Sequence, residues 1–150
     1  MNAYQPAAML GTLNRHGVEF VVIGDLAAAV YGSDSVLPIL QVCVRQTATN
    51  LESLSKALNE LEAVPRGAQT GAFQTMAGAI DCVAIPEGTA GYDDLYVRSW
   101  RFDLDGHDVP VCSIDDLIRM KRAAARPKDL YAVEHLTALK KLIESGAGNS

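Results

Sequence analysis

Apolar positions in the first third of the chain follow the pattern of two buried strands joined by a short helix. Val18–Ile23 is a nearly continuous run of apolar residues, which favours a strand covered on both faces. The alanine-rich segment Asp25–Tyr31 follows at once and predicts a short buried helix. Gly32 and Ser33 end this helix, and Val36–Val44 predicts the next strand. We expect the rest of the chain to be organised around this strand–helix–strand unit.

Helical periodicity marks the longer segments on both sides of this unit. Leucines at positions 51, 54, 58 and 61 recur at spacings of three and four residues, so one face of the segment is apolar. Ser113 stands before two acidic residues, which interact favourably with the N-terminal end of a helix. Four helices are expected, at Gln5–His16, Thr47–Leu61, Ser113–Ala125 and Lys128–Glu144.

Short strands and turns are expected between the second and third of these helices. Phe73–Met76 and Ala79–Ile85 are strand candidates, and Tyr92–Val97 predicts a helical turn. Ser99–Leu104 and Asp108–Val111 flank an Asp-Gly pair, which favours a tight hairpin turn because these residues accept positive φ angles. The order of all these elements predicts an α/β (α+β) fold with a small mixed β-sheet flanked by helices.

Length and composition are those of one globular domain. With 150 residues, of which 49% are hydrophobic and 21% charged, we expect a single domain over residues 1–150 with a frayed tail at 145–150. Apolar runs are too short to span a bilayer, and the N-terminal residues lack the pattern of a signal peptide. A soluble, cytoplasmic protein without a membrane partner is therefore expected.

Charge and cysteine content exclude some classes of ligand. The net charge of −5 argues against nucleic acid, because contact with phosphate backbones requires many Lys and Arg residues. A local basic stretch from Arg119 to Lys128 is typical of a solvated helix face. The three cysteines, Cys43, Cys82 and Cys112, are widely spaced and suit buried reduced thiols rather than disulfides or a zinc site.

Several motifs resemble one family through their order along the chain. They are Val21–Gly24, Leu26–Ala29, Tyr31–Ser33, Phe73–Thr75 with Gly78 and Asp81, and Ser113–Lys121 followed by Arg126–Leu130. This arrangement resembles the minimal nucleotidyltransferases of the DNA polymerase β type, in particular the small bacterial domains related to abortive-infection toxins. The resemblance covers residues 8–142 and implies a nucleotidyltransferase-like mixed sheet flanked by helices.

The resemblance also implies a site, from which this chain departs. In the family a Gly-Ser turn, here Gly32 and Ser33, supports nucleotide phosphates, and two acids on the next strand hold magnesium. A third acid on a neighbouring strand corresponds to Asp81. The two acid positions are occupied by Ile39 and Gln41, which lack the carboxylates that bind hard cations. Ordinary two-metal nucleotidyl transfer is therefore not expected, and neither is a metal or another cofactor.

A different use of the former nucleotide cleft is the main expectation. Leu37, Ile39 and Met76 would add apolar surface beside Gln41 and Asp81, which favours a neutral or apolar small molecule as ligand. A positioned carboxyl group can serve as general acid or base, so Asp81 and Gln41 are the candidate catalytic residues of metal-independent acid/base chemistry. The simpler alternative is that Asp81 is a hydrogen-bonded buried acid and Gln41 a satisfied strand amide.

Two further interpretations stay open. In one, the domain is a non-catalytic nucleotide-binding or toxin–antitoxin-type partner, with Lys121, Arg126 and Lys128 holding a phosphate group. In the other, Asp25, Asp34 and Asp81 rebuild a metal site that supports nucleotidyl transfer, although Asp25 also suits a helix cap and Asp34 a turn. The sequence identifies neither the ligand nor the oligomeric state.

Overall fold

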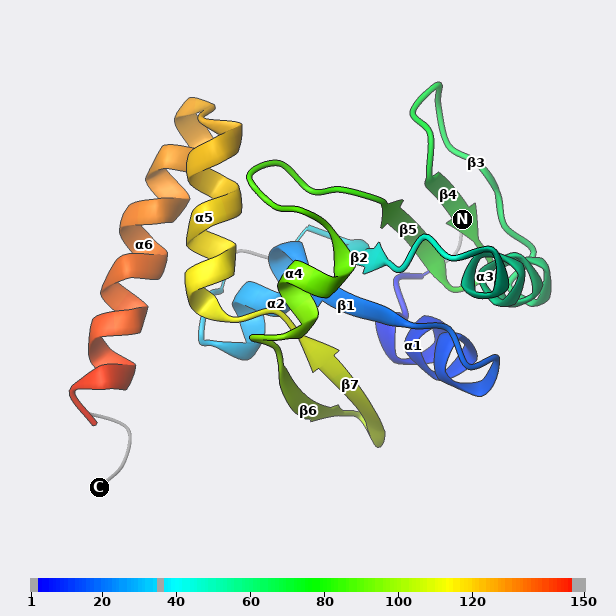
Figure 1. Ribbon diagram of the computed structural model, residues 1–150, viewed down its shortest axis with the longest axis horizontal. Coiled ribbons are helices and arrows are strands. Elements are labelled where there is room, and N and C mark those ends of the chain that lie inside the picture. Colours follow the sequence, from blue (N-terminus) through cyan, green and yellow to red (C-terminus); the bar gives the residue numbers. More distant parts are fainter. Residues whose placement is uncertain (1–2, 35–36, 147–150) are drawn as a thin grey trace.

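The computed structural model describes residues 3–34 and 37–146, which fold around a seven-stranded mixed sheet. The strand order is β3-β4-β5-β2-β1-β7-β6, as Figure 1 shows for most of the sheet. The strands are β1 (Phe20–Ile23), β2 (Ile39–Val44), β3 (Val64–Pro65), β4 (Ala72–Thr75), β5 (Gly78–Val83), β6 (Trp100–Leu104) and β7 (His107–Val111). An α/β fold with a mixed sheet is thereby confirmed.

The middle of the sheet is the strand–helix–strand unit expected from the sequence. β1 and β2 are antiparallel, and helix α2 (Gly24–Val30) connects them. β2 pairs in parallel with β5 on its other side, in a register that sets Gln41 opposite Asp81. β1 pairs in parallel with β7. The two candidate catalytic residues are thus direct neighbours in the centre of the sheet.

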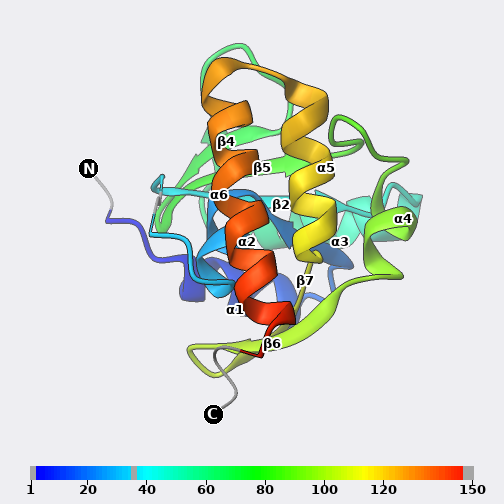
Figure 2. The same ribbon diagram turned by 90° about the vertical axis from the view of Figure 1, so that its left-hand side faces the viewer.

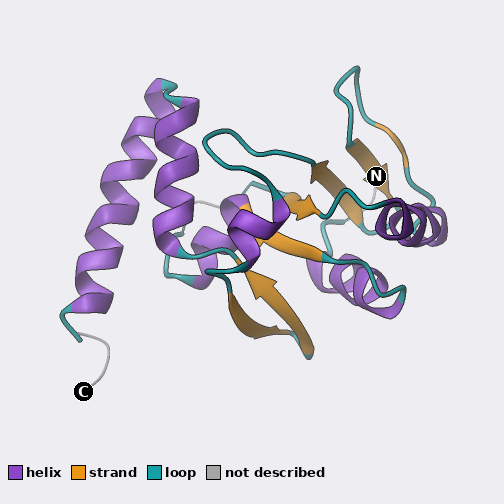
Figure 3. Ribbon diagram, viewed as in Figure 1, coloured by secondary structure: helices purple, strands orange, loops and turns teal. Residues whose placement is uncertain are grey.

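Helices flank this sheet, as Figure 3 shows. They are α1 (Pro6–Arg15), α2, α3 (Ala48–Glu60), α4 (Tyr92–Tyr96), α5 (Ile114–Ala124) and α6 (Pro127–Glu144). α1 and α3 contact each other, whereas α5 and α6 form a helical hairpin on the opposite side of the molecule (Figure 1). In the side view of Figure 2, this hairpin stands in front of the sheet and α2.

The core is formed by the apolar segments identified in the sequence. Val21, Val22, Leu40 and Val42 have exposed fractions of 0% in the central strands, and Ile80 of β5 joins them. Helices α1 and α3 add further buried side chains, including Met9, Leu10, Leu13, Leu54 and Leu58. Burying each such side chain stabilises the fold by about 1.5–3 kcal/mol. The apolar segments of the sequence therefore supply much of the free energy that holds these strands and helices together.

Thr47 and Ser113, the first residues of two predicted helices, cap α3 and α5 with their side chains. Thr47 accepts a hydrogen bond from Asn50 N at the start of α3, and Ser113 accepts one from Asp116 N at the start of α5. The turn at Asp105 adopts a positive φ of 52°, as the hairpin requires. Local chemistry therefore determines these element boundaries.

Some boundaries differ from the prediction. β2 begins at Ile39, and the predicted strand start at Val36 lies outside the described residues. The short strand β3 was not predicted, because its two residues carry no periodic pattern and are held only by pairing with β4. Of the predicted frayed tail, Ser145 and Gly146 still donate backbone hydrogen bonds to α6, and residues 147–150 lie outside the described part. None of the helices in the described ranges has the length and apolar character needed to cross a membrane.

Candidate functional site

The segment after α2 folds back tightly and is held by its own backbone. Ser33 N donates a hydrogen bond of 3.0 Å to Ala28 O, and Gly32 adopts a φ of 111°, which favours glycine. A side chain of α2 also holds Leu37, since Asp25 Oδ2 accepts a hydrogen bond of 2.8 Å from Leu37 N. Asp25 therefore does not cap α2, as one alternative expected, because its carboxylate binds Leu37 N rather than a backbone N–H of the helix.

A cleft of about 590 Å³ lies between this segment and α6. Its lining combines apolar and charged side chains from the two sides: Asp25, Ala28, Ser33, Asp34, Leu37, Lys121, Lys128, Asp129, Tyr131, Ala132, His135 and Leu136. Its volume is within the range of small-molecule sites in proteins. We refer to this cavity as the α2–α6 cleft.

Asp129, one of the three acids that line the α2–α6 cleft, is paired with two basic side chains. Asp129 has an exposed fraction of 1% and accepts hydrogen bonds from Arg126, including one of 2.5 Å from Nε. Lys121 Nζ lies 3.6 Å from its other oxygen. The Arg126 side chain, above all, lowers the pKa of Asp129, so the carboxylate stays charged. Asp129 therefore fixes the turn between α5 and α6 and places Lys121 at the cleft.

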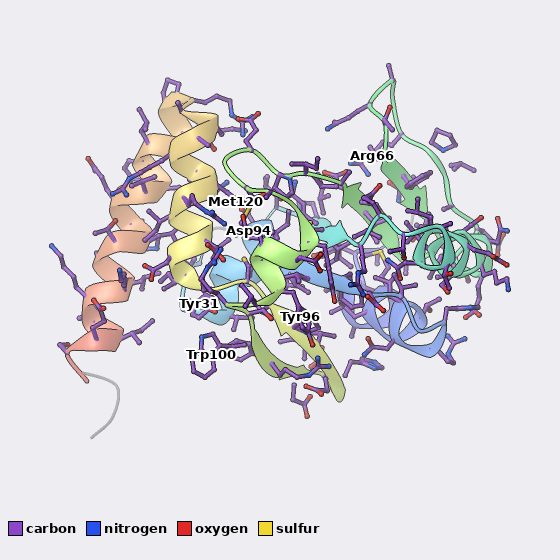
Figure 4. The ribbon with its side chains drawn as sticks, viewed as in Figure 1. Tyr31, Arg66, Asp94, Tyr96, Trp100 and Met120 are labelled. Atoms are coloured by element: carbon purple, nitrogen blue, oxygen red, sulfur yellow. The ribbon has the colours of Figure 1, made fainter. Side chains whose placement is uncertain are left out.

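A second polar group lies on the sheet, where the side chains of Gln41 in β2, Asp81 in β5 and Arg66 after β3 form a row. Gln41 Nε2 donates a hydrogen bond of 3.3 Å to Asp81 Oδ2, and the guanidinium of Arg66 forms an ion pair with Asp81 Oδ1. Arg66 N bonds to Ala72 O, and Ala72 pairs with Asp81 in the register of β4 and β5. The small Ala72 side chain thus allows Arg66, labelled in Figure 4, to reach Asp81.

Arg66 was missed in the sequence analysis. It follows a two-residue strand and lies in a hairpin whose register the sequence pattern does not reveal. Its guanidinium also bonds to Phe73 O at 2.6 Å, so it is held by the backbone as well as by the acid. The one signal in the sequence was Asp81 itself, because an acid among apolar residues requires a positively charged or hydrogen-bonding partner.

Gln41 also approaches the first turn of α2. Gly24 has a φ of 71°, and a Cβ atom added to it would lie 2.1 Å from Gln41 Oε1. Both residues line a second cavity, of about 210 Å³, which shares Lys121 and Asp129 with the α2–α6 cleft. The Gln41 side chain thus belongs both to the row on the sheet and to the wall of this second cavity.

The structure brings some of the candidate ligand-binding residues together. Ser33, Leu37, Lys121 and Lys128 all line the α2–α6 cleft. Gly32 lies behind them, and a Cβ atom at this position would be 3.5 Å from Leu139 of α6. Contacts between the end of α2 and the α5–α6 hairpin therefore create this part of the predicted site.

Other candidates lie apart from the cleft. Ile39 starts β2 opposite Ala79, and neither it nor Asp81 lines the two cavities described above. Met76 occupies the turn between β4 and β5, has an exposed fraction of 53% and donates its N–H to Leu61 O. The catalytic role of Asp81 and Gln41 stays a prediction, as does ligand contact by Ile39 and Met76.

The residues present do not fit a pair of magnesium ions. Ile39 and Gln41 stand at the positions implied for the paired acids, and Asp81 is bound by Arg66. Within residues 3–34 and 37–146, there is no group of three His, Cys, Asp or Glu side chains placed to hold a metal ion. Two magnesium ions require several carboxylate oxygens at about 2.0–2.1 Å, which this arrangement does not supply.

Comparison with known proteins supports the fold. No protein-family model matches the chain, and no curated protein matches it in sequence. Among solved structures, the chain is similar to the "putative nucleotidyltransferase (TM1012)" from Thermotoga maritima, with a TM-score of 0.57 and 14% sequence identity. The match covers 93% of this chain and 91% of the other. The fold is therefore nucleotidyltransferase-like over nearly the whole chain.

Proposed function

We propose that the protein uses its nucleotidyltransferase-like fold to bind a neutral or apolar small molecule in the α2–α6 cleft, without two-metal nucleotidyl transfer. The absence of two-metal transfer rests on the ion pair between Arg66 and Asp81, and the site of binding rests on the lining of the cleft. The guanidinium of Arg66 supplies a positive charge beside Asp81, the acid that the resemblance aligns with the third metal-binding carboxylate of the family. The one acid that corresponds to the family site is thus neutralised by the protein itself.

The lining of the cleft supports a ligand with substantial apolar surface. Ala28, Leu37, Tyr131, Ala132 and Leu136 contribute apolar or aromatic side chains, and Tyr131 is 75% exposed. An exposed aromatic ring beside a cavity can be covered by a bound ligand, and its hydroxyl can take part in a hydrogen bond. Two of the acids in the lining, Asp25 and Asp129, already have hydrogen-bond donors within the chain.

A nucleotide bound without catalysis is the second candidate. It is favoured by Lys121, Lys128 and His135, which line the same cleft as Ser33. Lys side chains are common phosphate ligands. In this case binding would not require magnesium, because the described residues include no group of three His, Cys, Asp or Glu side chains placed to hold the ion.

Ligand-observed NMR tests these candidates with two sets of probes. One set contains neutral ring compounds, including nucleosides, and the other contains nucleoside triphosphates with and without Mg²⁺. We expect neutral compounds to bind and Tyr131→Ala to weaken that binding about tenfold. Leu142→Ala is the matched control, because Leu142 is also exposed on α6, at 56%, but does not line the cleft.

The outcomes separate the candidates. Magnesium-independent triphosphate binding that is weakened by Lys128→Ala, with no binding of neutral compounds, would support the second candidate. Magnesium-dependent binding, or transfer of label from a triphosphate, would contradict the proposal that the protein lacks two-metal chemistry. Equal loss of binding in Tyr131→Ala and Leu142→Ala would place the ligand elsewhere.

A further inference from the structure

Strand β6 forms one edge of the sheet. It pairs with β7 on its inner side, and no other strand of residues 3–34 and 37–146 pairs with its outer side. Its residues are Trp100, Arg101, Phe102, Asp103 and Leu104, three of which are exposed. An open edge of this kind offers backbone groups to another strand.

The register shows which backbone groups point outward. Cys112 N, directly after β7, donates to Val22 O of β1, so alternate residues of β7, including Pro110, face β1 as well. Val109 and Val111 therefore face β6 and bond to Phe102 and Trp100, their partners in the register. The N–H and C=O groups of Arg101 and Asp103 consequently point to the open edge.

The residues of β6 are complementary to those of a second β6 strand that runs in the opposite direction. In an antiparallel pair of two β6 strands centred on Phe102, Arg101 of each copy lies opposite Asp103 of the other. The outward backbone groups of Arg101 and Asp103 then face each other and can exchange four hydrogen bonds across the pair. On the other face, Trp100 of each copy lies opposite Leu104 of its partner.

We propose that two copies of this chain form a symmetric dimer by pairing the outer edges of β6 in this register. One alignment satisfies the backbone groups and places opposite charges and apolar side chains together. Opposite charges that lie directly across two strands stabilise the pair of strands, and apolar side chains that face each other there are removed from water. The β6 edge is thus suited to a second copy rather than to an unrelated strand.

Trp100 gives this pairing an apolar contact. Its side chain is 66% exposed, and Figure 4 shows it on the outside of the molecule at the start of β6. A cavity of about 210 Å³ lies beside Leu104, at the other end of the strand, and is also lined by Ala7, Leu10 and Leu26. Because Trp100 of the second copy would lie opposite Leu104, its indole would reach this cavity. Each copy would bury its tryptophan on the other.

Contacts within one copy are compatible with the pairing. Arg101 Nε lies 2.8 Å from Asp108 Oδ2, but the two side chains are 53% and 68% exposed, so this is a weak surface pair. Asp103 Oδ1 accepts a bond of 2.7 Å from Gly106 N. A carboxylate has several acceptor positions, so Asp103 can also bind an arginine of a second copy.

Sedimentation and tryptophan fluorescence test the dimer with the intact chain. Trp100 is the single tryptophan, so its emission reports on this surface alone. Between about 1 µM and about 100 µM, we expect a shift from monomer to dimer with a blue shift of the emission. A monomer over this entire range would overturn the proposal.

Charge reversal tests the register. Arg101→Asp and Asp103→Arg, each alone, place like charges opposite each other and should weaken the dimer at least about tenfold. The double variant restores opposite charges in the antiparallel alignment and should recover dimerisation. Weakened dimers in both single variants and in the double variant would overturn this register.

Trp100→Ala provides a test that does not alter the hairpin charges. It should weaken the dimer about tenfold without lowering the thermal midpoint of the monomer, because the indole is exposed. Ile85→Ala is the matched control, since Ile85 is equally exposed at 66% and follows β5 on the other part of the sheet. An unchanged dimer in Trp100→Ala would show that β6 is not the interface.

Discussion

Arg66 and Asp81 illustrate how one residue pair changes the chemistry implied for a site. The side chains of Arg66 and Asp81 are 30% and 13% exposed, so their attraction is less screened by water than that of a surface pair. Removing the arginine would leave a largely buried carboxylate with Gln41 as its neighbouring side-chain donor. The pair therefore contributes to stability as well as occupying the acid.

The variant Arg66→Ala is expected to lose about 1–2 kcal/mol of unfolding free energy, because both the carboxylate and Phe73 O lose a donor. Urea unfolding measures this loss. Arg15→Ala is the control, since Arg15 pairs with Glu60 at side chains that are 61% and 41% exposed. Similar urea midpoints for the two variants would show that the Arg66 pair behaves as an ordinary surface pair.

Gly24 is a second residue whose role depends on a neighbour. Gly24→Ala is expected to lose about 1 kcal/mol for the positive φ and about 1 kcal/mol more for displacing the Gln41 side chain. Gly17→Ala is the matched control, because Gly17 has a φ of 70° and open space around the added methyl group. The difference in urea midpoint between the two variants isolates the contact with Gln41, and no difference would contradict it.

At the scale of elements, an ionic cluster attaches the short helix α4 to α5. Asp94 of α4 contacts Arg98 at 2.7 Å and Arg119 at 3.0 Å, and both arginines contact Asp116 of α5. Asp116 is 3% exposed, so the charges meet at a buried position. A helix of five residues has little stability of its own, and these contacts hold it in place.

This cluster predicts a pH dependence. Hydrogen bonds to Asp94, first from Ala90 N and then from Arg98, lower its pKa from 3.8 to about 2. A lowered pKa in the folded state means that the stabilisation is present above about pH 4 and is lost as the pH falls toward 2. Asp94→Asn should therefore be less stable by about 1 kcal/mol at pH 7, after allowance for solvent screening.

Urea unfolding between pH 7 and pH 3 measures this effect. The difference in unfolding free energy between Asp94→Asn and the unchanged chain should become smaller below pH 4. Asp93→Asn is the control, because the neighbouring Asp93 side chain is 83% exposed and should contribute little. A difference that stays constant with pH would contradict the role assigned to the Asp94 carboxylate.

At the scale of the whole molecule, the candidate site is divided between two regions. The α2–α6 cleft joins the end of α2 to the α5–α6 hairpin, whereas the row from Arg66 to Gln41 crosses the sheet. Lys121 and Gln41 both line the smaller cavity between them. The α2–α6 cleft and the row on the sheet are thus connected through the lining of this smaller cavity, and no residue of β6 lines either cavity.

The sequence by itself determined the helices and most strands. Apolar periodicity and capping residues such as Thr47 and Ser113 act within a few residues, so local physical chemistry is sufficient. That Ile39 and Gln41 occupy the two metal-binding positions of the family is a prediction that rests on the order of residues alone.

Only the tertiary structure decided which side chains meet. The register of β3, β4 and β5 aligns Arg66, Ala72 and Asp81, and a shift of one residue would have turned these side chains to the opposite face. The cleft likewise required α6 to pack beside the end of α2, a contact between residues about one hundred positions apart. Such contacts depend on strand register and helix packing, which no local pattern specifies.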